Sequence, residues 1–214
     1  EKLKTAFSLL FRPVLIRRIF SLYHQGYLRE RGWFESALMK QSVNKDNSPL
    51  IWCTYPFIDF ISARLKNDMS VFEYGCGNST LWFSEKVKKI DSVEHNRKWF
   101  ERINSLKPGN SNVVLKEESD PEGYAKAVRE SNERYDIIFI DGIERNKCIK
   151  YSIDSLKSGG IIILDNSERK DYSESFSFLK DAGFKNIDFF GISPIVNCTS
   201  CTTIFYKSDN CLGI

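Results

Sequence analysis

The chain has 214 residues, a length that suits one α/β domain with a buried core and a modest extension. Its 42% hydrophobic and 28% charged content is typical of a soluble globular protein, and a net charge of +3 gives no reason to expect a nucleic-acid partner. Six cysteines do not make a disulfide scaffold in a chain of this size, so we expect a reducing, cytoplasmic setting.

The first 49 residues are predicted to form a helical extension. Apolar and aromatic residues recur at helical spacing from Leu9 to Leu38, with arginines between them. Pro13 is placed to open a helix, and Gly26 and Gly32 are placed to interrupt it. Two interpretations stay open: a cap packed on the sheet or on a second subunit of a homodimer, and a basic amphipathic surface resting peripherally on a membrane. No apolar run approaches the ~18 residues that span a bilayer.

From about residue 50 onward, strand-like apolar runs alternate with helix-like segments, which predicts a parallel sheet of βαβ units. The five runs that precede a predicted helix are Ser70–Tyr74, Ile90–Glu94, Asn112–Lys116, Tyr135–Asp141 and Gly160–Asp165. Two further runs, Lys185–Phe190 and Cys201–Tyr206, have no helix between them, so they are expected to pair antiparallel. We therefore divide the chain into an extension, 1–49, and an α/β domain, 50–214.

The first of these strands ends in a glycine-rich turn that leads into a helix. Its expected ligand contacts are Glu73, Gly75, Gly77, Asn78 and Ser79. The two glycines let the backbone approach a ligand closely, and the helix start offers free N–H groups. A dinucleotide-binding turn would have a third glycine where Thr80 stands. Glu73 would repel phosphates but suits an ammonium group, so the turn favours a ligand with an amino-acid end.

The second strand ends in Glu94, an acid placed to accept both hydroxyls of an adenosine ribose. His95 follows it and is expected to line the same pocket. The alternative for Glu94 alone is an acid facing solvent at a strand end. Because Glu94 ends the strand that comes directly after the glycine turn and its helix, the ribose contact is favoured.

These residues resemble the class I S-adenosylmethionine-dependent methyltransferases. The likeness rests on Glu-x-Gly-x-Gly-x-Ser-Thr after the first strand, Glu94 after the second and Asp141 after the fourth, and it spans about Leu50 to Tyr206. It implies a Rossmann-like α/β fold whose seven strands have the order 3-2-1-4-5-7-6, with the last antiparallel. It also implies S-adenosyl-L-methionine as cofactor, with Asp141 beside it as the catalytic residue. More narrowly, Trp52-x-Thr-Tyr-Pro and the closing Asn-Cys-Leu-Gly-Ile look like a group of bacterial methyltransferase-like proteins.

A divalent-metal site is a further hypothesis. Asp141 closes the fourth strand, and Asp165 and Asn166 close the fifth, so their oxygens are expected at one sheet edge, where they suit Mg²⁺. The set is similar to the metal triad of catechol-type O-methyltransferases, in which the metal lowers the pKa of the acceptor hydroxyl. The sequence departs from that pattern because the lysine usual near the first aspartate is replaced by a run containing Arg145.

The acceptor side is the least constrained part. Thr54 and Tyr55, which precede a helix-like segment, are expected near the methyl-donor end as substrate contacts; the alternative is a turn packed on the sheet. We expect methyl transfer, to oxygen, on a small-molecule, glycan or lipid acceptor. The rival functions are a non-catalytic nucleoside-binding module and an aminopropyltransferase-like enzyme on the same fold. Cys198 and Cys201 offer a weak metal or redox pair.

Overall fold

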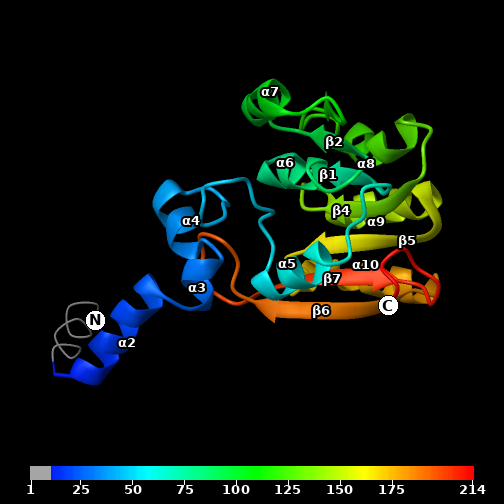
Figure 1. Ribbon diagram of the computed structural model, residues 1–214. Coiled ribbons are helices and arrows are strands. Elements are labelled where there is room, and N and C mark those ends of the chain that lie inside the picture. Colours follow the sequence, from blue (N-terminus) through cyan, green and yellow to red (C-terminus); the bar gives the residue numbers. More distant parts are fainter. Residues whose placement is uncertain (1–10) are drawn as a thin grey trace.

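A seven-stranded mixed sheet forms the centre of the molecule, for which the computed structural model describes residues 11–214 (Figure 1). The strand order is β3-β2-β1-β4-β5-β7-β6, as predicted. The strands are β1 (Ser70–Tyr74), β2 (Lys89–Glu94), β3 (Ser111–Leu115), β4 (Tyr135–Ile140), β5 (Leu156–Asp165), β6 (Lys185–Gly191) and β7 (Ser200–Tyr206). Only β7 runs antiparallel to both of its neighbours, β5 and β6, so the predicted terminal hairpin is confirmed.

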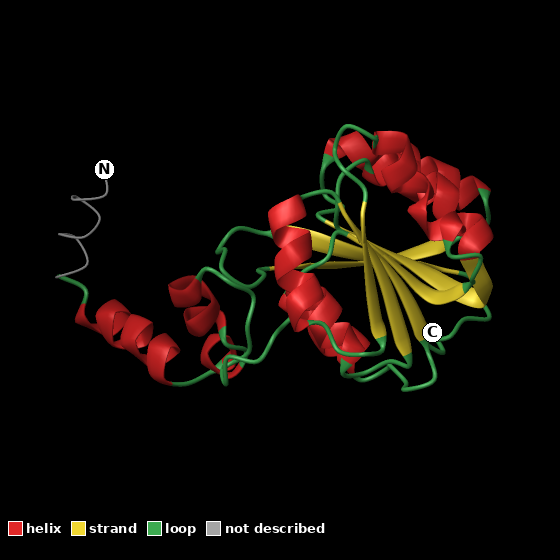
Figure 2. Ribbon diagram, turned by 90° about the horizontal axis from the view of Figure 1, so that it is seen from above, coloured by secondary structure: helices red, strands yellow, loops and turns green. Residues whose placement is uncertain are grey.

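Helices cover both faces of the sheet (Figure 2). One face carries α5 (Tyr55–Ser62), α6 (Asn78–Ser84) and α7 (Arg97–Leu106), and the other carries α8 (Pro121–Glu130), α9 (Arg145–Ser152) and α10 (Ser173–Asp181). Single turns of 3₁₀ helix occupy Ile153–Ser155 and Lys170–Tyr172. Consecutive residues of a strand point to opposite faces, so Val71 joins the core under α5 and α6 while Phe72 joins the core under α8 and α9. This layering brings the carboxyl ends of β1, β2, β4 and β5 to one edge.

The extension forms three helices, α2 (Pro13–His24), α3 (Tyr27–Glu30) and α4 (Trp33–Met39). The predicted helix start and helix breaks are confirmed. Pro13 is the first residue of α2, and Gly26 and Gly32, both with positive φ, separate the three helices. The hydroxyl of Tyr27 donates to Asp59 on α5, and the Trp33 indole donates to the carbonyl of Val196 between β6 and β7. The α3–α4 part is therefore docked on the α/β domain, whereas α2 projects away from it (Figure 1).

The strand boundaries agree with the predictions to within one residue, except at the start of β5. β5 begins at Leu156 rather than Gly160, because Leu156 pairs with Tyr135 before an irregularity shifts the register. Tyr55, expected to precede a helix-like segment, is instead the first residue of α5, with Pro56 in the first turn. Across residues 11–214, no helix combines the length and apolar character needed to cross a bilayer.

Candidate functional site

The glycine turn between β1 and α6 is tightly packed against the end of β4. Gly75 has a φ of +92°, which side chains rarely adopt, and a Cβ there would lie 3.0 Å from the Cα of Gly142. A Cβ on Gly142 would in turn lie 1.9 Å from the hydroxyl oxygen of Tyr124. Both positions therefore require glycine. The indole of Trp99 donates to the carbonyl of Cys76 and so lies along the turn.

Glu94 holds this turn in place. Its Oε2 accepts the backbone N–H of Cys76 at 2.9 Å, and its Oε1 accepts those of His95 at 3.0 Å and Asn96 at 2.8 Å. Asn96 then caps α7 by accepting from the N–H of Trp99. The Glu94 side chain is almost fully buried yet borders a cavity, and a carboxylate has about four lone-pair sites, so its oxygens have capacity beyond these three bonds.

Glu73 lies beneath the turn instead of in the cavity wall. It is fully buried on β1, and the hydroxyls of Ser79, Thr80 and Ser92 donate to its carboxylate. Burial raises its pKa to about 7, against the lowering effect of these hydroxyls. In this arrangement Glu73 fastens the start of α6 to the sheet. The predicted contact with an ammonium group would require the carboxylate to leave these partners.

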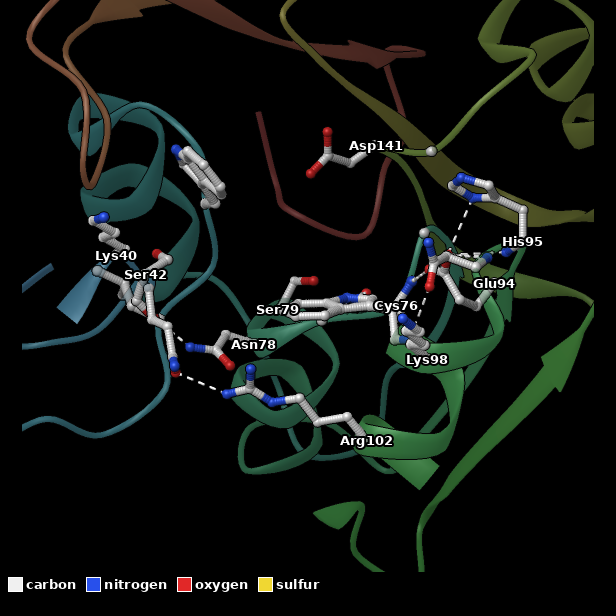
Figure 3. Close-up of a pocket in the computed structure, with 18 residues that line it drawn as sticks. Lys40, Ser42, Cys76, Asn78, Ser79, Glu94, His95, Lys98, Arg102 and Asp141 are labelled. Carbon is white, nitrogen blue, oxygen red and sulfur yellow. Dashed lines mark hydrogen bonds and ion pairs between the residues drawn. The ribbon is translucent and has the colours of Figure 1, made fainter. Parts of the chain in front are cut away.

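A cavity of about 610 Å³ opens above the turn; we call it the cradle cavity (Figure 3). Its volume falls in the range of small-molecule sites. It is bordered by most of the sequence-predicted cofactor residues: Gly75, Gly77, Asn78, Ser79, Glu94, His95 and Asp141. In Figure 3 Glu94 and His95 lie at one end, Asn78 and Ser79 lie nearer the other, and Asp141 faces the space between them. His95 Nδ1 lies 3.1 Å from Glu94 Oε1.

The helical extension supplies a wall of the cradle cavity that the sequence analysis did not predict. Lys40, Gln41 and Ser42 border it, as do Leu50 and Trp52 of the segment leading to α5. The Asn78 side chain donates to the carbonyl of Ser42 at 2.7 Å, and Arg102 of α7 donates to the side chain of Gln41 at 2.9 Å. Lys98 and Arg102 are also bordering residues that were missed. The boundary at residue 49 therefore does not separate the site from the extension.

The three residues of the metal hypothesis do come together, but around a guanidinium group. Arg145, the first residue of α9, donates to Asp141 Oδ1 at 2.8 Å and to Asn166 Oδ1 at 3.3 Å, and its other bonds go to the carbonyls of Asp141, Gly142 and Asp165. Asp165 Oδ1 accepts from the Thr202 hydroxyl at 2.6 Å. Burial and the Asp141 charge raise the pKa of Asp165 to about 8. The positive charge of Arg145 thus lies where the hypothesis places a cation, and these residues do not fit a metal site.

Within residues 11–214, no group of three or more His, Cys, Asp or Glu side chains is arranged to hold a metal ion. Cys198 is exposed and Cys201 is buried in β7, both as free thiols, and neither belongs to such a group.

A second cavity, of about 460 Å³, adjoins the first; we call it the side cavity. Asp141 and Trp52 border both cavities. The remaining wall of the side cavity comes from the segment after β5 and from the β6–β7 connection: Asp165, Asn166, Glu168, Arg169, Ser193, Val196, Cys198, Thr199 and Ser200. Its lining is rich in carboxylate, amide, guanidinium and hydroxyl groups.

Thr54 and Tyr55 border neither cavity, so their prediction as substrate contacts is not supported by the structure. Both side chains are fully buried. The Thr54 hydroxyl donates to the carbonyl of Phe189 at 2.9 Å, and Tyr55 lies in the core under α5. Thr54 precedes α5 and Tyr55 is the first residue of that helix, and both are packed in the interior. Their neighbour Trp52, which is 46% exposed, reaches the cavities instead.

Comparison with known proteins identifies the fold. No protein-family model and no curated protein sequence matches the chain. Among solved structures, a Staphylococcus aureus protein assigned as a caffeoyl-CoA O-methyltransferase is similar at a TM-score of 0.56 and 15% identity, over 89% of this chain and 98% of that one.

Two further structures were solved for proteins named as methyltransferases or holding the cofactor. A precorrin-6y C5,15-methyltransferase from Geobacter metallireducens matches with a TM-score of 0.54 and 19% identity, over 72% of this chain and 87% of that one. Aeropyrum pernix fibrillarin with natively bound S-adenosyl-L-methionine matches with a TM-score of 0.52 and 14% identity, over 80% of this chain and 73% of that one. The structures that this chain resembles are class I methyltransferases, and the chain has the fold of that family.

Proposed function

We propose that this protein is an S-adenosylmethionine-dependent methyltransferase that transfers the methyl group to an oxygen atom of its acceptor. The observation that carries the proposal is the meeting of two cavities at Asp141 and Trp52. One cavity is a glycine-walled cradle suited to the methyl donor, and the other is a polar space suited to the acceptor. A transfer between two bound molecules needs both, side by side.

The residues of the cradle cavity fit the donor. Gly75 and Gly142 border the cavity, and because they lack a Cβ the turn after β1 and the end of β4 pack closely together beneath it. Glu94 has about one lone-pair site left for a ribose hydroxyl at one end of the cavity, and Lys40 lies with Asn78 and Ser79 toward the other, where a carboxylate would be stabilised (Figure 3). Glu73 supports the turn from below without contacting the ligand.

When bound, S-adenosylmethionine supplies a methyl group on its sulfonium sulfur, and an acceptor oxygen in line with the carbon–sulfur bond takes that methyl group and leaves S-adenosylhomocysteine. Asp141 is the residue of this chain placed for the chemical step, because its side chain borders both cavities. Its carboxylate would accept the proton of the acceptor hydroxyl as the oxygen bonds to the methyl group. Arg145 fixes the orientation of that carboxylate through the 2.8 Å bond.

The acceptor that fits the side cavity is a polar molecule with several hydroxyl groups. Asn166, Arg169 and the hydroxyls of Ser193, Thr199 and Ser200 offer both donors and acceptors, and Trp52 offers an apolar ring for stacking. A small molecule and the polar end of a glycan or lipid both meet this description. The likeness to a protein assigned as an O-methyltransferase over 89% of this chain is consistent with it.

The test is titration calorimetry with S-adenosylhomocysteine, followed by transfer of labelled methyl groups to a panel of hydroxylated acceptors. Wild-type protein is expected to bind the ligand, and Glu94→Gln is expected to bind it at least about tenfold more weakly because the carboxylate makes charge-assisted bonds. Glu101→Gln, an exposed carboxylate on α7, serves as the matched control and should bind normally. Thermal melting of each variant separates lost binding from lost folding.

Two results would overturn the proposal. Wild-type protein that does not bind S-adenosylhomocysteine at about millimolar concentration is not a methyltransferase of this kind, given the affinity range of enzyme ligands. Binding without turnover on any acceptor class, together with turnover of the decarboxylated cofactor on a polyamine, would point instead to an aminopropyl transfer.

A further inference from the structure

The charge of the chain is unevenly distributed along its sequence. Residues 2–29 contain six basic residues and no aspartate or glutamate; the basic residues are Lys2, Lys4, Arg12, Arg17, Arg18 and Arg29. The whole chain has 31 basic and 28 acidic residues, so removing these six leaves 25 basic against 28 acidic elsewhere. The net charge of +3 therefore arises from a positive N-terminal segment joined to a mildly negative remainder.

Within this segment, α2 has an apolar face and a basic face. At 100° per residue, Leu15, Ile16, Ile19, Phe20, Leu22 and Tyr23 fall within an arc of roughly 160°. Arg17 and Arg18 lie at the two borders of this arc, and Val14 and Ser21 lie between them on the opposite face. A helix with a broad apolar face bordered by arginines is typical of helices that lie in the interface of a bilayer.

The apolar face of α2 is exposed. Phe20 is 63% exposed and Ile19 is 47% exposed, and α2 has no buried residue in the described structure. Among the described residues, the C-terminal end of the helix meets the rest of the extension, where the ring of Tyr23 contacts that of Phe34 edge to face. Figure 1 shows α2 projecting from the α/β domain while α3 and α4 lie against it. Exposed apolar side chains gathered on one face of a projecting helix mark an interaction site.

We propose that α2 docks this protein on the surface of an anionic lipid bilayer, with its apolar face inserted and Arg17 and Arg18 at the headgroups. The charge of the helix favours lipid over a second copy of the chain. Two copies of α2 packed face to face would bring arginines together with no acidic residue on either helix to pair with them. An anionic surface instead attracts each basic residue by about 1 kcal/mol.

This inference is independent of the proposed function, because α2 borders neither the cradle cavity nor the side cavity. The test uses the full chain in co-sedimentation with vesicles of phosphatidylcholine alone and of phosphatidylcholine mixed with phosphatidylglycerol at roughly three to one. The protein is expected to sediment with the mixed vesicles, and to be released as salt rises.

Two variants on α2 and one control separate the contributions. Arg17→Glu with Arg18→Glu should weaken binding to the mixed vesicles by at least about tenfold, and Ile19→Glu should do the same by removing inserted apolar area. Lys180→Glu with Lys185→Glu makes the same charge change at exposed positions of α10 and β6 and should leave binding unchanged. Because all of these side chains are exposed, S-adenosylhomocysteine binding and melting temperature should stay at wild-type values.

Three outcomes would refute the docking proposal. The first is absence of binding to the mixed vesicles. The second is binding that the arginine variant leaves intact. The third is a dimer in sedimentation equilibrium without lipid that Ile19→Glu abolishes, since that would identify a second copy as the occupant of the apolar face.

Discussion

The cradle cavity and the side cavity share Asp141 and Trp52 but are built in different ways. The cradle cavity lies on the turns that follow β1, β2 and β4, where Gly75 and Gly142 let two turns pack closely, and its outer walls come from the extension and α7. The side cavity is formed by side chains of the segment after β5 and of the β6–β7 connection. A site built from backbone at strand ends tolerates little variation, whereas a site built from loop side chains is free to vary.

The largest effect is expected from adding a side chain to the glycine turn beneath the cradle cavity. Gly75→Ala puts a residue with a Cβ at φ +92° and 3.0 Å from Gly142, so either the turn or the β4 end must move. A strain of this kind is worth about 1 to 3 kcal/mol, and we expect S-adenosylhomocysteine to bind roughly 10- to 100-fold more weakly. Calorimetry measures the affinity.

Gly109→Ala is the matched control, because Gly109 has open space around its Cβ position and lacks a positive φ. This variant should bind the ligand as the wild-type protein does. Equal affinity in Gly75→Ala and Gly109→Ala would mean that the turn does not form the donor site.

An opposite pattern is expected in the side cavity. Arg169 borders the side cavity but not the cradle cavity, and it donates a hydrogen bond to Asn166 Oδ1 at 3.3 Å. Arg169→Ala should lower kcat/KM for methyl transfer by about tenfold, the loss of one charged hydrogen bond, and should leave S-adenosylhomocysteine affinity unchanged. Arg129→Ala, on the far side of the sheet in α8, is the control. If Arg169→Ala weakened ligand binding as much as turnover, the two cavities would not have separate occupants.

The same contrast explains how much the sequence predicted. The seven strands, the glycine turn and the positions of Glu94 and Asp141 follow from apolar periodicity and local spacing. Because parallel strands end at one edge, residues far apart in the chain could be assigned to one site. The wall formed by Lys40, Gln41 and Ser42 could not be predicted from the sequence. It depends on how the extension folds back and forms hydrogen bonds with Asn78 and Arg102.

Arg145 and Glu73 show a second limit. The sequence placed Asp141, Asp165 and Asn166 together, but a metal ion and a guanidinium satisfy the same oxygens, and only the direction of the Arg145 side chain distinguishes them. Glu73 was expected to face the ligand because it adjoins the glycines. Its side chain instead points to the face of the sheet under α6, where the hydroxyls of Ser79, Thr80 and Ser92 donate hydrogen bonds to its carboxylate. The hydroxyl residues at these three positions are the feature of the sequence that indicates a buried, hydrogen-bonded Glu73.

The smallest expected effect concerns this support beneath the cradle, and it appears only in the pH dependence of stability. Burial raises the pKa of Glu73 from 4.5 to about 7. Below about pH 4.5 both the folded and the unfolded chain hold the proton, so the residue contributes nothing. Between about pH 4.5 and 7 the unfolded chain releases the proton while the folded protein keeps it. Rising pH therefore favours unfolding, and the penalty is complete above about pH 7.

Glu73→Gln removes this titration while keeping the shape of the protonated side chain. We expect the variant and the wild-type protein to melt at similar temperatures near pH 5, and the variant to melt higher at pH 8, by roughly 3 to 10 °C. The other buried carboxylates titrate in both proteins, so their contributions cancel in the difference. Melting curves at pH 5 and pH 8 give the comparison directly. A wild-type protein that becomes more stable than Glu73→Gln as the pH rises would show that the carboxylate is charged in the folded state, and that its three hydroxyl donors outweigh the cost of burying it.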